Sequence, residues 1–458
     1  MTLDRSMTPQ ERRAAFSLAF VFMLRMLGLF LILPVFALYA EHLEGATPLL
    51  VGLAIGTYGL TQALLQMPFG LASDRIGRKP VIIAGLIIFA IGSMVAAMAD
   101  SITGVIVGRA IQGAGAIAAT VMALAADLTR EEHRLKAMAV IGSSIGVSFS
   151  IALIAGPVLN SWMGVPGIFW LTAVLAVLGI VVVQYVVPNP VVTRVHRDAE
   201  AIPGLIKEVL ANGELLRLNS GIFALHLILT ASFVTVPLTL RDHAGLAADQ
   251  HWMVYLGVMV TALVLMVPFI IYAEKRRRLK PVFVAAVGVV VLAQLGLALG
   301  YDSLMGTVLA LLVFFTAFNL LEASLPSLVA KTAPPDKKGT AMGIYSSSQF
   351  FGAFSGGAAG GWLHGSLGVA GVFVFCAIVA GIWFMLALTM ANPRYLSSQM
   401  LNVGPISEDD GRRIATELMA VRGVAEAVVR AEEGVAYLKV DSQVVDWDAL
   451  AKFSVEGV

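Results

Sequence analysis

Cysteine is nearly absent from this sequence, and the usual signatures of enzymes are missing. The single thiol, Cys376, excludes a disulfide framework or a cysteine metal site built from this chain. No glycine-rich loop ending in Gly-Lys-Ser or Gly-Lys-Thr occurs, so ATP is not the expected source of energy. No nucleophile paired with a base and no cluster of metal ligands stands out. An enzyme is therefore the least favoured class of protein, and no metal site is expected.

Charged residues are also rare, at 13% of the chain, whereas hydrophobic residues make up 58% and the mean hydropathy is +0.85. Soluble domains carry about 25% charged residues. Apolar stretches of about 20 residues recur from Phe16 onward, each long enough to cross a hydrocarbon layer roughly 30 Å thick. Because these runs are unbroken rather than alternating, they predict helices and not a β-barrel. We expect an all-α membrane protein with twelve transmembrane helices, which begin near residues 15, 49, 80, 101, 136, 166, 217, 252, 281, 304, 340 and 367.

The loops between these runs alternate in basic content. Lysine and arginine gather before the first run and after every second one, as at Arg75, Arg78 and Lys79. The intervening loops contain a single lysine or arginine, Arg241. Cytoplasmic loops of membrane proteins carry an excess of lysine and arginine. Both termini of this multi-pass chain are therefore expected in the cytoplasm.

Two stretches of sequence recur about 200 positions apart. "PFGLASDRIGRKPV" at 68–81 has a relative in "PFIIYAEKRRRLKPV" at 268–282, and "KAMAVIGSS" at 136–144 has one in "TAMGIYSSS" at 340–348. Such duplication is typical of secondary transporters, whose substrate sites lie between the two halves at mid-membrane depth. We expect two six-helix pseudo-repeats, at 1–188 and 217–393, joined by a cytoplasmic linker at 189–216.

The composition changes after Pro393, where the last sixty-five positions contain eleven of the thirty acidic residues. Ser407, followed by three acidic residues, predicts the capped start of a helix. The segment 424–442 predicts two alternating strands around a Glu-Gly turn, with a leading strand at 395–401 and a short helix at 446–454. We expect residues 394–458 to form a small cytoplasmic α+β domain.

Three motifs resemble signatures of the major facilitator superfamily (MFS) and of its drug:proton antiporter branch. The run from Gly70 to Lys79 resembles the signature of the loop between helices 2 and 3, and "GRAIQGAGA", which contains Arg109, resembles a helix-4 signature. Gly142, Gly146, Gly156 and Pro157 resemble a glycine-rich antiporter motif of helix 5, although Asn160 and Ser161 stand where that motif has its closing glycines. The C-terminal segment resembles a ferredoxin-like module. The resemblance implies the MFS fold, transport by alternating access and the bacterial inner (plasma) membrane.

The charged turn between helices 2 and 3 is a candidate conformational latch, formed by Gly70, Asp74, Arg75, Gly77 and Arg78. Its glycines permit a sharp reversal, and its arginines are planar donors that can hold a carboxylate. Asp127, at the cytoplasmic end of helix 4, is the candidate partner. The resemblance implies that this cluster fastens the two halves on the cytoplasmic side when the cavity faces outward, with Asp74 meeting helix 11. The alternative is an ordinary hydrated loop whose charges only set the topology.

Few ionisable residues lie inside the predicted helices, where an unpaired charge costs several kcal/mol. Arg25, Arg109, Glu322 and His226 fall in helices 1, 4, 10 and 7, which line the cavity in the superfamily. Arg25, His226 and Glu322 could share one layer. Proton binding at Glu322 could compete with substrate or with Arg25; the alternative is a permanent Arg25–Glu322 ion pair. His226 is either a titrating group or a satisfied polar residue, and Arg109 either orients helix 4 or meets a proton relay.

Four amides could line a polar cavity or hydrogen-bond between helices: Gln62, Gln66, Asn319 and Gln349. Gly156 and Pro157 would allow close packing and a bend in helix 5. The sequence and the resemblance together favour a proton-coupled exporter of small organic molecules, driven by the proton gradient without a cofactor. A proton symporter that imports a metabolite stays open, as does a membrane sensor that signals through the C-terminal domain.

The expected partners are the lipid bilayer, a small-molecule substrate and protons. A net charge of +1 gives no indication of a nucleic-acid partner. The C-terminal domain is a candidate for regulation, for self-association, or for a passive stabilising cap.

Overall fold

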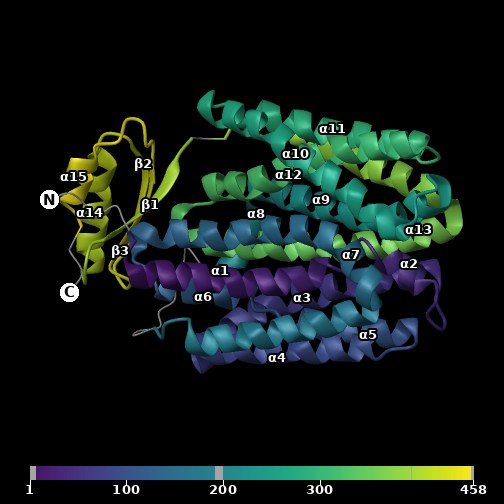
Figure 1. The fold of residues 1–458 in the computed structure, drawn as a ribbon. Coiled ribbons are helices and arrows are strands. Elements are labelled where there is room, and N and C mark those ends of the chain that lie inside the picture. Colours follow the sequence, from purple (N-terminus) through teal and green to yellow (C-terminus); the bar gives the residue numbers. More distant parts are fainter. Residues whose placement is uncertain (1–6, 191–199, 394, 455–458) are drawn as a thin grey trace.

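The computed structural model describes residues 7–190, 200–393 and 395–454. Ten helical segments in this part of the chain are long and apolar enough to cross a membrane. They lie side by side along one direction (Figure 1). They are α1 (Pro9–Phe30), α3 (Pro48–Ile76), α4 (Arg78–Ala97), α5 (Ile102–Ala114) with α6 (Ala118–Asp127), α7 (Glu131–Tyr185), α9 (Gly213–Leu238) with η2 (Thr239–His243), η3 (Ala248–Gln250) with α10 (His251–Lys275), α11 (Leu279–Gly300), α12 (Leu304–Thr332), and η4 (Pro335–Lys337) with α13 (Lys338–Leu388). The short elements are α2 (Phe36–Ala40), η1 (Pro203–Leu205) and α8 (Ile206–Ala211).

The two longest helices, α7 and α13, each fold back at one glycine. Gly164 and Gly368 have φ angles of 67° and 69° inside otherwise helical segments, a conformation that costs glycine little. Both ends of α7 lie beside the start of α1, because Arg130 contacts Glu11 and the carbonyl of Val186 accepts from Arg13. The residues flanking α13 likewise both contact the segment 208–217. Each of these helices therefore runs along the bundle twice.

The bundle has two distinct ends. The loops at 76–78, 128–130, 276–278 and 333–337, each of which contains at least one lysine or arginine, lie at the end that also bears the C-terminal domain. We call this the basic end. The loops that contain Glu41, Ser101, Arg241 and Asp302 lie at the opposite end.

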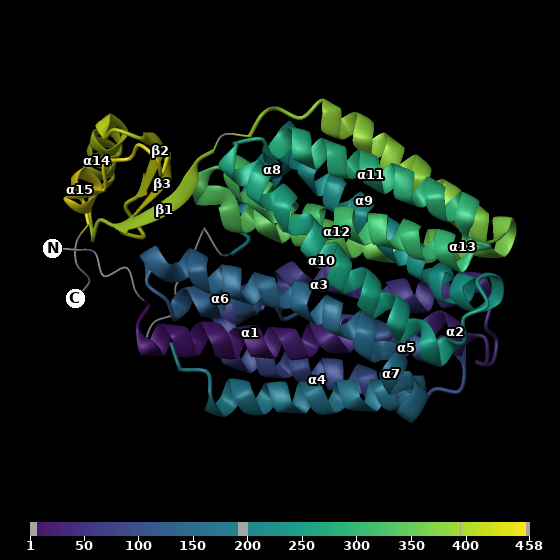
Figure 2. The same cartoon turned by 45° about the horizontal axis from the view of Figure 1, so that its top comes forward.

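The helices form two bundles, α1–α7 and α8–α13, which lie next to each other (Figure 2). One apolar core contains residues from both bundles, and its members from the first bundle come from 31–43, 51–55, 96–105 and 149–169, toward the opposite end. A second core, whose buried members all come from the first bundle, includes residues 18–26 and 117–125 nearer the basic end. The two bundles therefore pack together most continuously at the opposite end.

Small residues bring α3 and α13 into backbone contact near the opposite end. A methyl group added to Gly52 would lie 2.0 Å from the carbonyl oxygen of Gly357 and 2.9 Å from the Cα of Gly361. Such distances leave no room for any side chain but hydrogen. At the same end, Arg241 of the second bundle donates to Glu41 of the first at 2.7 and 3.0 Å. These contacts close the bundle at its opposite end.

The C-terminal domain has the element order that the sequence predicts. It consists of β1 (Ser397–Asn402), α14 (Glu408–Ala420), β2 (Val424–Arg430), β3 (Val435–Val440) and α15 (Trp447–Ala451). The strands form an antiparallel sheet in the order β1-β3-β2, with a bulge between Val424 and Glu426. The central strand β3 is buried throughout, and Ser407 caps α14 as expected.

This domain contacts both bundles at the basic end. Lys439 of β3 donates to two carbonyl oxygens at the end of α12, at 2.6 and 3.0 Å, and burial lowers its pKa to about 8. Arg277, between α10 and α11, donates to Asp441 at 2.9 Å and thereby lowers the pKa of that carboxyl. Met400 of β1 lies 3.8 Å from a guanidinium nitrogen of Arg134 in α7. The domain thus spans the boundary between the two bundles.

Candidate functional site

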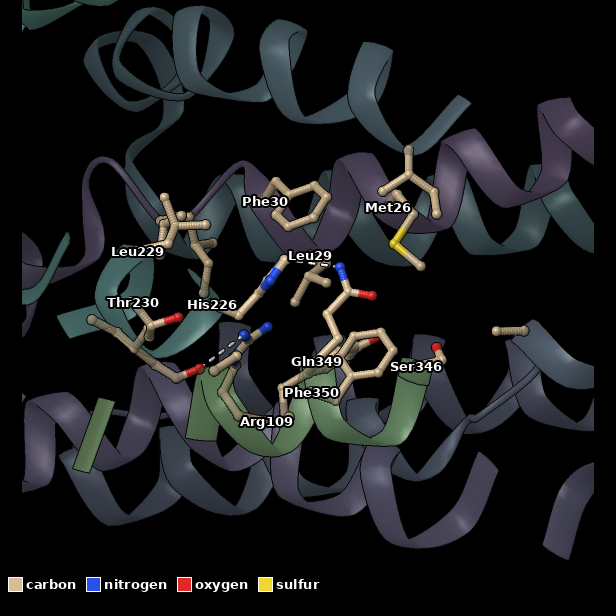
Figure 3. A pocket seen from close by; sticks show the side chains of 18 of the residues that line it. Met26, Leu29, Phe30, Arg109, His226, Leu229, Thr230, Ser346, Gln349 and Phe350 are labelled. Atoms are coloured by element: carbon tan, nitrogen blue, oxygen red, sulfur yellow. Dashed lines mark hydrogen bonds between the residues drawn. The ribbon is translucent and has the colours of Figure 1, made fainter. Parts of the chain in front are cut away.

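A pocket lies between the two bundles. Its walls come from α1, α3, α5, α6 and α7 of the first bundle and from α9 and α13 of the second. The wall residues 346–353 lie eight to fifteen residues into α13, or about 12 to 22 Å from its start. The pocket therefore lies well inside the bundle rather than at a surface. Side chains from both bundles point into it, among them Met26, Phe30, Arg109, His226 and Gln349 (Figure 3).

Two arginines of the first bundle lie beside one tyrosine of the pocket wall. The guanidinium carbon of Arg109 lies 5.0 Å from the centre of the Tyr58 ring, and that of Arg25 lies 5.7 Å from it. Both arginines are buried, with exposed fractions of 2% and 1%. An aromatic ring attracts a nearby cation through its quadrupole. Tyr58, which sequence reasoning did not single out, therefore contributes to holding both charges.

The glycines of "GRAIQGAGA" explain how these groups come together. Predicted as one helix, this span breaks into α5 and α6 around Gly115, and Arg25 donates to the Gly115 carbonyl at 3.0 Å. A methyl group on Gly113 would lie 2.2 Å from the carbonyl oxygen of Tyr58, and one on Gly115 would lie 2.3 Å from that of Gly85. The motif therefore allows the broken helix to pack directly against the backbones of α3 and α4.

The remaining partners of the two arginines are neutral. Arg25 donates to the amide oxygen of Gln62 at 2.5 Å, and Gln62 donates in turn to Gln66 at 3.2 Å. Arg109 donates to the amide oxygen of Gln112 at 2.8 Å and to two carbonyl oxygens of α3 at 3.4 Å. Among the residues that the structure describes, neither arginine forms an ion pair.

Glu322 belongs to a separate polar group on the second bundle. The amide nitrogen of Gln349 lies 3.2 Å from a carboxylate oxygen of Glu322 and 2.8 Å from Nε2 of His226. The same histidine nitrogen lies 3.9 Å from the other carboxylate oxygen. His226 and Gln349 line the pocket, so this triad connects Glu322 to the pocket wall.

The Arg25–Glu322 ion pair, one of the two alternatives open from the sequence, is therefore not formed in this structure. Arg25 is held by Gln62 and Gly115, whereas Glu322 is held by Gln349, and one carboxylate oxygen of Glu322 accepts no hydrogen bond from the described part of the chain. The sequence placed these side chains at similar depth but could not indicate which way each one points around its helix. Asn319 does not join the triad, and its buried amide nitrogen also lacks a partner among the described residues.

At the basic end, Arg78 is the centre of an ion-pair cluster. Arg78 donates to Asp127 at 3.2 Å, to Ser73 at 2.7 Å, and to Asp74. The side chains of Arg78 and Asp127 are completely buried. The cluster therefore joins the end of α3, the start of α4 and the end of α6 within the first bundle.

The expected meeting of Asp74 with helix 11 applies to the state in which the cavity faces outward, whereas this structure is closed at the opposite end. Asp74 pairs with Arg78 rather than with the start of α13, and Arg75 is exposed. The connection instead runs through the linker, where Glu200 accepts from Arg78 at 2.7 Å. Two residues later, the backbone nitrogen of Ile202 donates to Thr340 of α13 at 3.0 Å. Sequence reasoning missed Glu200, whose only signal is that it is an acidic residue near the end of the linker.

The glycines of the helix-5 motif have different surroundings. A methyl group on Gly156 would lie 2.5 Å from the carbonyl oxygen of Leu31, so this glycine packs α7 against the chain after α1. Nothing lies within 4 Å of methyl positions on Gly142 and Gly146. Pro157 lies inside α7, but the non-helical residue of that segment is Gly164. Gly142 and Gly146 lie in the part of α7 before the fold at Gly164, on the side nearer the basic end.

No group of three or more histidine, cysteine or acidic side chains gathers as a metal site in the described residues.

Known proteins resemble this chain in sequence and in fold. The sequence profile of the Major Facilitator Superfamily matches residues 18–320 and 218–399. The inner membrane transport protein YajR of Escherichia coli (strain K12) is 48% identical over 443 residues, which are 97% of this chain and 97% of that protein. Multidrug resistance protein MdtH of Aeromonas salmonicida (strain A449) is 26% identical over 359 residues, 77% of this chain and 88% of that one. A solved bacterial homologue of the human lysosomal transporter Spinster, inward-facing and occupied, matches with a TM-score of 0.67 at 13% identity, over 84% of this chain and 98% of that one.

The sequence is that of a membrane transporter, and the chain belongs to the Major Facilitator Superfamily. It is a multi-pass transporter of the inner membrane and not an enzyme. The similarity to YajR extends over nearly the whole chain, including the C-terminal domain. The family resemblance noted in the sequence is thereby confirmed.

Proposed function

We propose that this protein is a proton-coupled secondary transporter that exports small organic molecules across the inner membrane by alternating access. The proton gradient is its energy source, and it uses no cofactor. In this proposal the chain crosses the membrane twelve times, because α7 and α13 each contribute two crossings. The basic end faces the cytoplasm, as the excess of lysine and arginine in its loops favours.

One observation carries the proposal: the pocket lies between the two bundles, and its wall includes two of the three members of the Glu322 triad. A change in how the bundles pack would expose such a pocket first to one side and then to the other. The continuous core and the α3–α13 contact close the opposite end here.

Glu322 is the proposed proton carrier. Protonation removes the charge that accepts the hydrogen bond from Gln349, and Gln349 also contacts His226 on the pocket wall. Proton binding can therefore change which donors and acceptors the pocket presents. A carboxylate without a lysine or arginine partner is suited to this role, since neutralising it removes the cost of a buried charge.

The test begins with a compound whose cellular accumulation falls when the protein is overexpressed and rises when its gene is deleted. Flux of that compound is then measured in proteoliposomes under an imposed proton gradient. Glu322→Gln should abolish gradient-driven flux while retaining downhill exchange. Glu274→Gln is the matched control, since Glu274 pairs with Lys331 at the basic end and should leave both unchanged. Gradient-driven export by Glu322→Gln would contradict the coupling role, and gradient-driven import by the unmodified protein would indicate a symporter.

The C-terminal domain is proposed to regulate the transport cycle rather than to act as a passive cap. It contacts α7 through Met400 and α12 through Lys439, so moving the bundles apart at the basic end must break one set of contacts. We also propose that it is a ferredoxin-like module. The order β1-β3-β2 and the βαββα succession support this assignment, with three strands in the described residues.

A further inference from the structure

The pocket carries positive charge that the protein does not balance. Arg109 lines it, and Arg25 lies beside Tyr58 of its wall. The hydrogen-bond acceptors of both arginines are amide and carbonyl oxygens rather than carboxylates. Two nitrogens of the Arg25 guanidinium, Nε and Nη1, are buried without a partner in the described residues.

No acidic side chain compensates this charge from the pocket wall. The residues that line the pocket include neither aspartate nor glutamate, and Glu322 reaches the wall only through Gln349 and His226. In a low-dielectric interior an uncompensated guanidinium strongly favours a nearby anion. A cationic ligand would instead add a further like charge beside the arginines.

The rest of the wall is apolar and aromatic. Met26 and Phe30 of α1 lie across the pocket from Arg109 and Phe350, with His226 and Gln349 between the two sides (Figure 3). Ser346 and Thr230 add hydroxyl groups on the second bundle. The complementary ligand has a flat apolar body and one negatively charged group.

We propose that the pocket binds aromatic organic anions, such as carboxylates or sulfonates, with the anionic group at Arg109 and the ring between Phe30 and Phe350. A guanidinium and a carboxylate or sulfonate form paired, charge-assisted hydrogen bonds, which a neutral ring compound cannot form. The bound anion supplies the negative charge that the protein does not place beside Arg25 and Arg109. This inference rests on the proposed function, because it takes the pocket as the transport site.

The test compares three probes on the full-length protein in nanodiscs by isothermal titration calorimetry. They are naphthalene-2-sulfonate, the uncharged naphthalene-2-sulfonamide, and the cationic 2-naphthylmethylammonium. The sulfonate should bind roughly tenfold or more tightly than either of the others, as expected for a charge-assisted contact. Equal or tighter binding of the amide or the cation by the unmodified protein would overturn the proposal, and this comparison needs no variant to fold.

Variants then locate the preference. Arg109→Gln should lose the preference for the sulfonate while Arg109→Lys keeps part of it, and Arg217→Gln, at the basic end outside the pocket, should behave as the unmodified protein. Thermal unfolding confirms that each variant is folded. A preference that survives in folded Arg109→Gln would overturn the assignment to this arginine.

Flux separates this inference from the proposed function. Tight sulfonate binding without gradient-driven flux of any compound would leave the anion site standing and contradict proton-coupled transport. Gradient-driven flux of neutral or cationic compounds, with no preference for the sulfonate, would support transport and overturn the anion site.

Discussion

Gly52 offers a direct way to perturb the closure of the opposite end. In Gly52→Ala the new methyl group would lie 2.0 Å from the Gly357 carbonyl oxygen, whereas an ordinary contact needs at least 3.4 Å. The obstructing atoms are backbone, so the helices must separate by about 1.4 Å in this region (3.4 − 2.0). Overpacking of this kind costs about 1–3 kcal/mol. The cost falls only on the state in which α3 and α13 touch.

The population of that state should therefore fall. Since 1.4 kcal/mol corresponds to a factor of ten, a cost of about 1–3 kcal/mol shifts the equilibrium roughly 5- to 150-fold toward opening at this end. The distance between spin labels at Leu49→Cys and Leu367→Cys, in a Cys376→Ser background and in nanodiscs, reports the change. We expect a second, longer population in Gly52→Ala.

Gly381→Ala is the matched control, because it lies on α13 and nothing occupies the 4 Å around its added methyl group. It should leave the distances unchanged and raise the stability by about 0.5–1 kcal/mol through helix propensity. Gly357→Ala should reproduce the effect of Gly52→Ala, and the double variant should show less than the sum, because both act on one contact. An unchanged distance distribution in folded Gly52→Ala would refute the assigned closure.

Two further predictions concern the basic end. Glu200→Gln removes one of the carboxylates around buried Arg78 and should lower the stability by about 1–3 kcal/mol in thermal unfolding. Glu208→Gln breaks an exposed ion pair and should cost less than about 1 kcal/mol. Equal losses of stability in the two variants would contradict the role of Glu200. The pKa of Lys439 is about 8 when the C-terminal domain is docked and near 10.5 when the side chain is exposed. Between these pH values the undocked domain binds more protons than the docked one, so docking should tighten as the pH rises from 8 to 10. Spin-label distances between α14 and α10 measure docking; Lys439→Met should remove the dependence, and weaker docking at higher pH would contradict the argument.

The features that depend on the local order of residues along the chain were predicted well. Unbroken apolar runs predicted the spans, including the paired spans that meet at Gly164 and Gly368. The cap at Ser407 and the alternation at 424–440 predicted the elements of the C-terminal domain because each signal is local.

Pairings between distant side chains could not be predicted in the same way. Counting residues gives the depth of Arg25 and Glu322 but not the rotation of their helices, so it left open whether these two side chains pair. Glu200 was missed because the path of a linker has no periodic pattern. Tyr58 was missed because a tyrosine within an apolar run has the same signature whether it faces lipid or two arginines.

Side-specific labelling of the pocket tests the central claim of access from one side at a time. Ser346→Cys places a small thiol on the pocket wall in a Cys376→Ser background. A membrane-impermeant thiol reagent should label this cysteine from the basic-end side when Gly52 is present. In Gly52→Ala it should label the cysteine from the opposite side as well. Labelling from neither side, or equally from both sides in the unmodified state, would contradict the account.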